Sequence, residues 1–414
     1  MHRAFLIGFL ALTTLPAFAH ADNDVKFNAQ VRHRFEFVDK DFNSDQNPYT
    51  FSFLRTRIGA KFNPAEGVGA FIQLQDSRTF GEETSTLGDG SADLLDLHQG
   101  FLFIKDFYGK PINLKLGRYE VNYGPQRLIG AVGWHNVGRS FDGGTARLHK
   151  ENYWVDAFAF TEAESLMAGD IGDAYVAGVW ANWMANESYS VQPFWVWQRK
   201  SPSSRLNRHT IGFYVKGKGN FYHEAEFAYQ TGTITSMVNT LVEQDVSASM
   251  AALNVGMKFP DMSGAPNLSA GVDYLSGDAG TDSTEFKVFD TLYATNHKYY
   301  GFMDFFLNIP ANTFGKGLID SHVKLGVKPH TNLVTNLAVH VFRAAEDFAY
   351  TDANAIQATS KSFGTEVDLT AKLKYNEKLG FTFGASIFSP GDIFKQMKGD
   401  DTSSWFYVMT TLNG

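Results

Sequence analysis

The sequence predicts an all-β protein, a transmembrane antiparallel β-barrel, and three observations lead to this class. Aromatic residues make up 15% of the 414 residues, cysteine is absent, and no apolar run is long enough to cross a membrane as a helix. Apolar and polar residues instead alternate along many short segments. Such alternation is the pattern of barrel strands that turn one face to lipid and the other to a water-filled lumen.

The N-terminus has the layout of an export signal. Arg3 precedes an apolar run, and the small residues of Ala17-Phe18-Ala19 follow it. This order is typical of a secretory signal peptide. We therefore expect residues 1–21 to be a signal peptide, cleaved after residue 19 or 21, and residues 22–414 to form a single barrel domain in the bacterial outer membrane.

The alternation is clearest near the N-terminus. In residues 25–37, Phe27, Val31 and Phe35 share one face, and basic residues share the other. Residues 54–62 repeat this arrangement, and similar segments follow at 210–216, 221–230, 319–328 and 363–375. We place the charged faces inside, because Phe, Tyr and Trp gather at segment ends, where the aromatic girdles of membrane barrels lie.

The connections between these segments alternate between short and long. Residues 217–220 form a short turn, whereas 39–50, 81–93, 162–173 and 276–297 are long and polar. We expect short periplasmic turns and long extracellular loops. About eighteen or nineteen segments qualify as strands, and an even number is required if both termini lie on the periplasmic side.

Arginine is concentrated in one part of the chain. Nine of the fourteen arginines lie between Arg32 and Arg147, although the net charge of −8 argues against nucleic acid as a partner. A guanidinium is always charged and binds carboxylates with two hydrogen bonds. We therefore predict an arginine-lined lumen, with acidic neighbours that orient the arginines. The predicted lumen residues are Arg32, Arg34, Arg55, Arg57, Lys61, Arg118, Arg127, Arg139 and Arg147, and the predicted orienting acids are Asp76, Glu120, Asp142 and Asp156.

A simpler interpretation remains open for these arginines. They could pair with lumen carboxylates and only fill the barrel. Arg78 is a separate case. In the two-residue period of its segment it shares a face with Ile72 and Leu74, which places it on the outward face near the outer rim.

One stretch carries a family resemblance. Residues 116–144, LGRYEVNYGPQRLIGAVGWHNVGRSFDGG, combine arginine, glycine and aromatic residues. Three further stretches follow the same resemblance: FLRTRIGAKFNP (53–64), TLYATNHKYYGFMDFF (291–306), and GTEVDLTAKLKY with FSPGDIFKQMKGDD (364–401). Together they resemble the alginate-export family of outer-membrane porins over nearly the whole mature chain. The resemblance implies about eighteen strands, with sixteen as the alternative, and an arginine-rich conduction path.

The resemblance also implies partners. They are outer-membrane lipid, the barrel assembly machinery, and an anionic oligo- or polysaccharide or small anionic solute. Outer-membrane barrels usually end in an aromatic residue, whereas this sequence ends in Gly414.

The leading functional hypothesis is passive diffusion of alginate, a related uronate or another small anion. An outer-membrane barrel enzyme, or a structural barrel that anchors or sheathes an exported partner, are the alternatives. No nucleophile-elbow or zinc-protease motif is present, and none of the twelve histidines has a ligand partner at metal-binding spacing. We therefore expect no enzyme activity, no cofactor and no metal.

Overall fold

The alternating segments form long strands in the computed structural model, which describes residues 25–80, 95–163, 173–201, 205–236, 242–280, 284–351 and 356–414. The expected signal peptide, residues 1–21, and the long connection 81–93 lie outside the described residues. The long strands are β1 (Lys26–Asp39), β2 (Tyr49–Ala65), β3 (Val68–Phe80), β4 (Asp96–Ile104), β5 (Ile112–Tyr119), β6 (Phe141–His149), β7 (Tyr153–Ala163), β8 (Ala174–Met184), β9 (Tyr189–Lys200), β10 (Leu206–Gly217), β11 (Phe221–Ser236), β12 (Val242–Lys258), β13 (Asn267–Leu275), β15 (Leu318–His330), β16 (Leu333–Thr351), β17 (Gln357–Lys374), β18 (Leu379–Pro390) and β19 (Ser403–Asn413).

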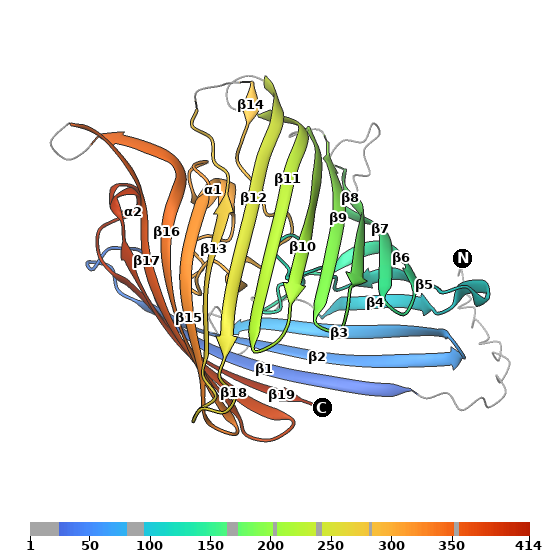
Figure 1. The fold of residues 1–414 in the computed structure, drawn as a ribbon. Helices are drawn as coiled ribbons and strands as arrows, with labels where there is room; N and C mark the ends of the chain where they lie inside the picture. The colour runs from blue at the N-terminus through green and yellow to red at the C-terminus, as the bar shows by residue number, and fades with distance from the viewer. Residues whose placement is uncertain are drawn as a thin grey trace, which may run out of the picture.

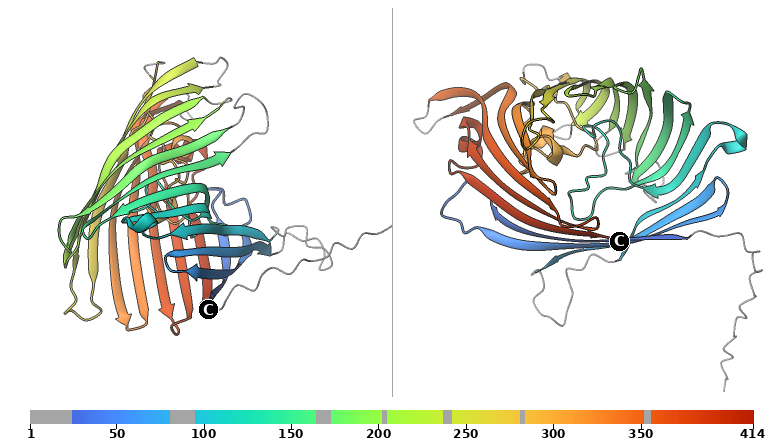
Figure 2. Two further views of the ribbon diagram at one scale, coloured as in Figure 1. Left: turned by 90° about the vertical axis from the view of Figure 1, so that its right-hand side faces the viewer. Right: turned by 60° about the horizontal axis from the view of Figure 1, so that its bottom comes forward.

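These strands close into one barrel. Each pairs antiparallel with the next along the chain, and β1 pairs with β19 (Figures 1 and 2). In the described part of the chain, the closed antiparallel barrel has 18 strands, as the family resemblance implied. The two-residue β14 (Glu285–Phe286) is additional and pairs in parallel with β12.

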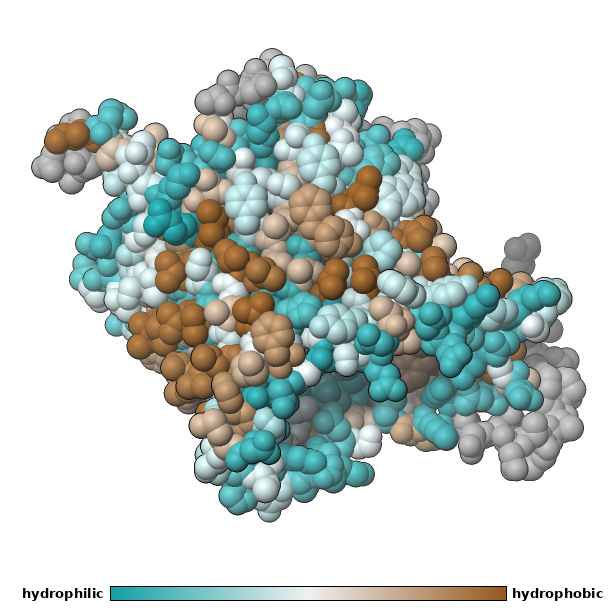
Figure 3. Space-filling view, in the orientation of Figure 1, coloured by the Kyte–Doolittle hydropathy of each residue, from teal (hydrophilic) through white to brown (hydrophobic). Residues whose placement is uncertain are grey.

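The predicted alternation gives the strands an apolar outer face and a polar inner face. On β1, Phe27 is 76% exposed, whereas Arg32 and Arg34 are buried. On β2, Ile58 is 59% exposed between the buried Arg57 and Gly59. On the face that Figure 3 shows, hydrophobic side chains gather in a band across the strands, with hydrophilic side chains above and below it. The sidedness expected for β1 and β2 is therefore confirmed.

Two glycines allow close strand approach where β4, β5, β6 and β7 meet. Gly117 and Gly143 have φ angles of +128° and +155°, which residues with a side chain rarely adopt. A Cβ atom at Gly117 would lie 2.3 Å from the carbonyl oxygen of Gly100, and one at Gly143 would lie 2.1 Å from that of Ala159. These glycines therefore permit the pairing of β5 with β4 and of β6 with β7, on either side of the β5–β6 connection.

The two ends of the barrel differ as expected. The start of β1 and the end of β19 lie at the end with short turns, such as 66–67, 150–152 and 331–332, and the long connections in the described part of the chain lie at the other end. The structure also contains the short helices η1 (Phe107–Gly109), η2 (Asn296–Lys298), α1 (Ile309–Asn312) and α2 (Asp392–Met397). Among the described residues, no helix is both long and apolar enough to cross a membrane.

Two long connections fold into the barrel: the β5–β6 loop (residues 120–140) and the part of the β13–β15 connection at residues 287–317, which we call the β13–β15 loop. Both lie inside the ring of strands in Figure 2, and Ile129 and Tyr293 join them in a parallel β-bridge. The second loop inserts buried aromatic residues. The ring centroid of Phe306 lies 4.6 Å from the ring centroid of Phe342 on β16, and both residues are buried.

The interior is therefore partly hydrophobic. The alternation of the strands did not predict this, because the residues that fill the interior come from a connection and have no strand period. Burial of these aromatic side chains stabilises the β13–β15 loop against the wall.

Candidate functional site

The predicted arginines of β1 and β2 lie on the inner wall, beneath the β5–β6 loop. The side chains of Arg32, Arg34, Arg55 and Arg57 point inward, and each is at most 8% exposed. Arg32 and Arg55 are directly opposite one another in the pairing of β1 with β2. Strand alternation therefore concentrates four guanidinium groups on one part of the wall.

The loop backbone occupies these guanidinium groups. Arg32 donates to the carbonyl oxygens of Gly133 (2.6 Å), Trp134 (3.2 Å) and His135 (3.0 Å). Arg55 donates to the carbonyls of Gly133 and His135, both at 3.3 Å. We refer to Arg32, Arg34, Arg55 and Arg57 as the loop-anchoring arginines, because all four bond to carbonyls of residues 133–137.

Carboxylates neutralise only two of the loop-anchoring arginines. Arg34 pairs with Glu36 at 2.6 Å, and Arg57 pairs with Glu120 at 3.0 Å. Arg32 and Arg55 have no ion pair with any carboxylate in the described part of the chain. Glu120 thus lies beside a predicted lumen arginine, whereas backbone carbonyls are the partners that the sequence did not reveal.

Two further predicted arginines lie in the loop itself. Arg127 is buried and forms two hydrogen bonds with Asp273 of β13, at 2.9 and 3.0 Å, with Glu226 at 3.9 Å. Burial alone would lower the pKa of Arg127, but Asp273 and the nearby acidic groups raise the pKa well above its ordinary value. Arg127 therefore belongs to a buried ion pair with Asp273 and is not free to bind a solute.

Arg139 differs from Arg127. Its guanidinium donates to the carbonyls of Gly130, Tyr293 and Ala294, and it has no ion pair among the described residues. Desolvation by burial lowers the pKa of Arg139 from its ordinary value, although an arginine remains charged at neutral pH. Arg139 thus joins the two inward-folded loops and adds a positive charge that no carboxylate neutralises.

The remaining predicted residues separate into inner and outer positions. Arg147 points inward and pairs with Asp156 at 2.6 and 2.7 Å. Arg118 pairs with Asp142 at 2.5 Å, and both residues line the outer cavity described below, together with Arg139.

Asp76 is also placed differently from the expectation. It pairs with Arg78 at 2.7 Å, and both residues share the outward face of β3 with Leu74. Asp76 therefore orients no arginine of the lumen. The physical reason is the two-residue period of β3. Gln75 and Ser77 are buried on the inward face, so Asp76 between them points outward.

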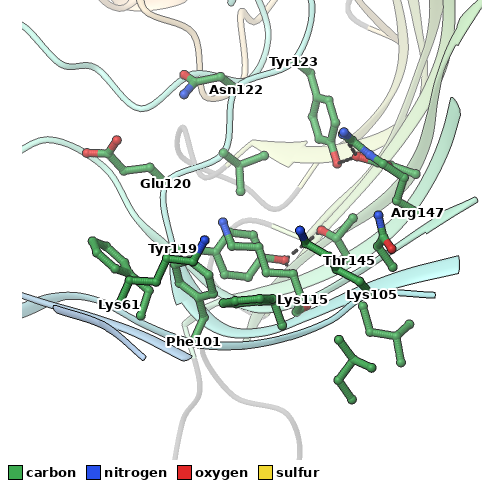
Figure 4. Close-up of a pocket in the computed structure, with 17 residues that line it drawn as sticks. Lys61, Phe101, Lys105, Lys115, Tyr119, Glu120, Asn122, Tyr123, Thr145 and Arg147 are labelled. Carbon is green, nitrogen blue, oxygen red and sulfur yellow. Dashed lines mark hydrogen bonds and ion pairs between the residues drawn. The ribbon is translucent and has the colours of Figure 1, made fainter. Parts of the chain in front are cut away.

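An inner cavity lies between the β5–β6 loop and the end of the barrel with short turns. It has a volume of about 630 Å³ (Figure 4). The side chains of Lys61, Lys105 and Lys115 line it and form no ion pair with any described residue. The ammonium nitrogen of Lys115 lies 4.0 Å from the ring centroids of both Phe101 and Tyr119. The other lining residues include Arg147, Glu120, Asp156, Phe71, Phe103 and Tyr123.

An outer cavity lies on the other side of the β5–β6 loop, toward the long connections. Its volume is about 610 Å³, and Arg118, Arg139, Lys200 and Arg208 contribute positive charges. Lys200 pairs with Glu162 at 2.7 Å, and Arg208 pairs with Asp290 at 2.8 Å. The sequence did not single out Lys105, Lys115, Lys200 or Arg208 as lumen residues. Arg208 could have been found, because it shares the inward alternation of Thr210 and Tyr214 on β10.

This arrangement suits weak, repeated binding of anions. Each cavity has more basic than acidic lining side chains, and the β5–β6 loop separates the two. Low-dielectric walls concentrate the field of fixed charges inside a narrow passage. A solute can then enter and leave through several similar sites.

Solved structures of similar fold come from Acinetobacter baumannii and Pseudomonas aeruginosa. OccAB4 of Acinetobacter baumannii has a TM-score of 0.60 at 10% identity, over 94% of this chain and 98% of that one. OccK8 (OprE) of Pseudomonas aeruginosa has a TM-score of 0.60 at 11% identity, with the same coverage. The outer membrane protein opdK of Pseudomonas aeruginosa has a TM-score of 0.59 at 10% identity, also with that coverage.

Sequence comparison gives the family. The sequence matched none of the curated proteins with which it was compared. Residues 23–408, almost the whole chain, match the model of the alginate export family. The chain therefore belongs to the alginate export family and is a channel-forming barrel of the bacterial outer membrane.

Proposed function

We propose that this channel passes short anionic saccharides, such as oligomers of uronic acids, by passive diffusion and without chemical change. The observation that carries the proposal is the inner cavity, where Lys61, Lys105 and Lys115 have no carboxylate partner among the described residues. A solute with one carboxylate per sugar would supply the missing negative charges.

The aromatic lining supports a saccharide over a simple inorganic anion. Phe101, Phe103 and Tyr119 place ring surfaces beside the lysine ammonium groups. The apolar face of a sugar ring can lie against such a surface while its carboxylate meets a lysine. The volume of about 630 Å³ is also in the range of pockets that hold small organic ligands.

The inward-folded loops support short oligomers over a long polymer. The loop-anchoring arginines hold one loop, and packed aromatic residues hold the other. Passage of a long chain would require both loops to leave these contacts. The proposal does not depend on the direction of transport, because passive diffusion follows the concentration gradient.

The test is block of ion current by a defined oligouronate in a planar bilayer. Lys61→Gln and Lys115→Gln together should weaken block by about tenfold, because a charge-assisted contact contributes about 1.5–3 kcal/mol when dry and less in a wet pore. Lys110→Gln is the matched control, since Lys110 is exposed in the turn after β4 and does not line the cavity. A neutral oligosaccharide of equal length should block weakly in all variants.

The opposite result would favour another function. If the double variant retains the affinity of the wild type for the oligouronate, the inner cavity does not select anions. Cleavage of the oligomer by the purified barrel would support the enzyme alternative. A barrel without conductance that co-purifies with an exported protein would support the anchor alternative.

A further inference from the structure

Three side chains with metal-binding chemistry meet on the inner wall of the barrel, on strands that β17, β18 and β19 separate from β1. Asp320 and His322 lie on β15, and His340 lies on β16. Asp320 and His322 are two residues apart and share the inward face. The pairing of β15 with β16 places His322 directly opposite His340.

The three groups are close and buried. One potential ligand atom from each residue lies within 4.8 Å of the others. A carboxylate oxygen of Asp320 lies 2.8 Å from Nδ1 of His340 and 3.3 Å from Nδ1 of His322. All three residues are less than 10% exposed, and Nδ1 of His322 is a buried atom with no hydrogen-bond partner.

The neighbouring strand leaves room for this arrangement. Gly271 of β13 faces His322 in the strand pairing, and a Cβ atom there would lie 2.5 Å from Nε2 of His322. On the other side, the ring of Phe342 stacks on His340 at a centroid distance of 5.5 Å. The packing thus orients both imidazole rings next to the same carboxylate.

We propose that Asp320, His322 and His340 form a binding site for a divalent transition-metal ion. Two imidazole nitrogens and one carboxylate are typical ligands for zinc and its neighbours in the first transition row. With zinc–nitrogen bonds of about 2.0–2.1 Å, two ligand atoms of a tetrahedral site lie about 3.3 Å apart. The separation of Asp320 and His322 has this value, and that of Asp320 and His340 requires only a small widening.

The site has an access route and an open coordination position. His340 also lines a third cavity of about 500 Å³, through which an ion could reach the cluster. Three protein ligands leave a fourth position for water or a solute group. The ion would replace the proton that otherwise links the imidazole of His340 to Asp320, so binding should weaken as the pH falls.

The competing explanation is a hydrogen-bonded cluster without metal. In that case Asp320 accepts from protonated nitrogens of the two histidines and only joins β15 to β16. Lys324, two positions beyond His322 on the same face, would disfavour a second positive charge nearby. The two explanations differ in one measurable property, stoichiometric metal binding by the folded barrel.

The experiment uses the full mature chain without a histidine tag, purified in detergent and treated with a chelator. Titration with Zn²⁺ should show one site per barrel, and Co²⁺ should give the visible absorption of a low-symmetry cobalt complex. Asp320→Asn and His322→Gln should each weaken Zn²⁺ binding by more than about tenfold, because loss of even an outer-shell partner costs that much. His330→Ala is the matched control, since His330 lies on the same strand in an exposed position.

Two results would overturn the proposal. One is the absence of a stoichiometric Zn²⁺ site in the wild-type barrel. The other is wild-type Zn²⁺ affinity in both Asp320→Asn and His322→Gln, with the far-UV circular dichroism spectrum confirming that both variants are folded. If either variant fails to fold, His340→Gln gives the same comparison from the neighbouring strand.

Discussion

Arginine side chains have two distinct roles in this barrel. Arg127 forms a buried ion pair with Asp273, whereas Arg32 and Arg55 donate to backbone carbonyls and keep their charges unneutralised by any described carboxylate. A guanidinium has five N–H donors, so it can satisfy several carbonyls of an irregular loop at once. Lysine could not satisfy several separated carbonyls in this way, because its three N–H donors are all on a single nitrogen.

His135 gives the β5–β6 loop a pH-dependent contact. Its Nδ1 accepts a hydrogen bond from the backbone N–H of Val137 at 3.2 Å, which requires an unprotonated nitrogen. Burial, followed by the charges of Arg34, Arg32 and Arg139, lowers the pKa of His135 below its ordinary value. The released loop therefore binds the proton more readily than the docked loop does.

We predict that acidification loosens this loop. The docking contribution is fully present above the ordinary pKa of about 6.5 and declines as the pH falls from there toward the lowered pKa. Single-channel recordings should show more frequent current fluctuations across this window. His135→Gln should show no such change, and an equal pH response in this variant would mean that another group is responsible.

At the scale of elements, the β5–β6 loop is positioned by β1 and β2, far from it in sequence. Arg32→Ala together with Arg55→Ala would leave the carbonyls of Gly133 and His135 without these donors. An unsatisfied buried polar group costs about 1–3 kcal/mol. We therefore predict faster amide hydrogen exchange over residues 131–137, measured by mass spectrometry.

A matched control separates loop anchoring from loss of charge. Arg78→Ala removes one arginine charge from the outward face of β3 and should leave exchange in residues 131–137 unchanged. Equal exchange in the double variant and the wild type would show that the β5–β6 loop holds its position without these arginines.

The sequence predicted the strands better than it predicted the site. Alternation identified the inward face of β1 and β2 correctly, because one strand period determines the direction of each side chain. It could not show that residues 120–140 fold into the barrel, since that depends on contacts with Arg32 and Arg55, which lie 101 and 78 positions from Gly133. The pairing of His322 with His340 was hidden for the same reason, because register and not spacing brings them together.

At the scale of the whole molecule, basic and acidic side chains are concentrated on different parts of the inner wall. The loop-anchoring arginines lie on β1 and β2 with one buried acid, Glu36, whereas the buried acids Asp273, Asp320, Glu366 and Asp368 lie on β13, β15 and β17. The net charge of −8 describes the sum over the chain. A permeating ion instead responds to the few charges that line the passage, because mobile salt screens distant ones within about 8 Å.

The outer cavity offers the sharpest test of this view. Arg139 carries a charge that no described carboxylate neutralises, and it lies where both inward-folded loops meet. One unit charge 4 Å from an ion contributes about 1 kcal/mol in water, a factor of about five. Arg139→Gln should therefore reduce the anion-to-cation permeability ratio by roughly two- to fivefold, measured from the reversal potential in a salt gradient.

Two control variants separate the charge of Arg139 from its bonds and its position. Arg139→Lys keeps the charge and loses part of the carbonyl bonding, so its reversal potential should stay close to that of the wild type. Lys218→Gln, in the exposed turn after β10, removes a charge that salt screens and should change little. If Arg139→Gln keeps the wild-type reversal potential, Arg139 serves to join the two loops, and the selectivity of the channel arises from other residues.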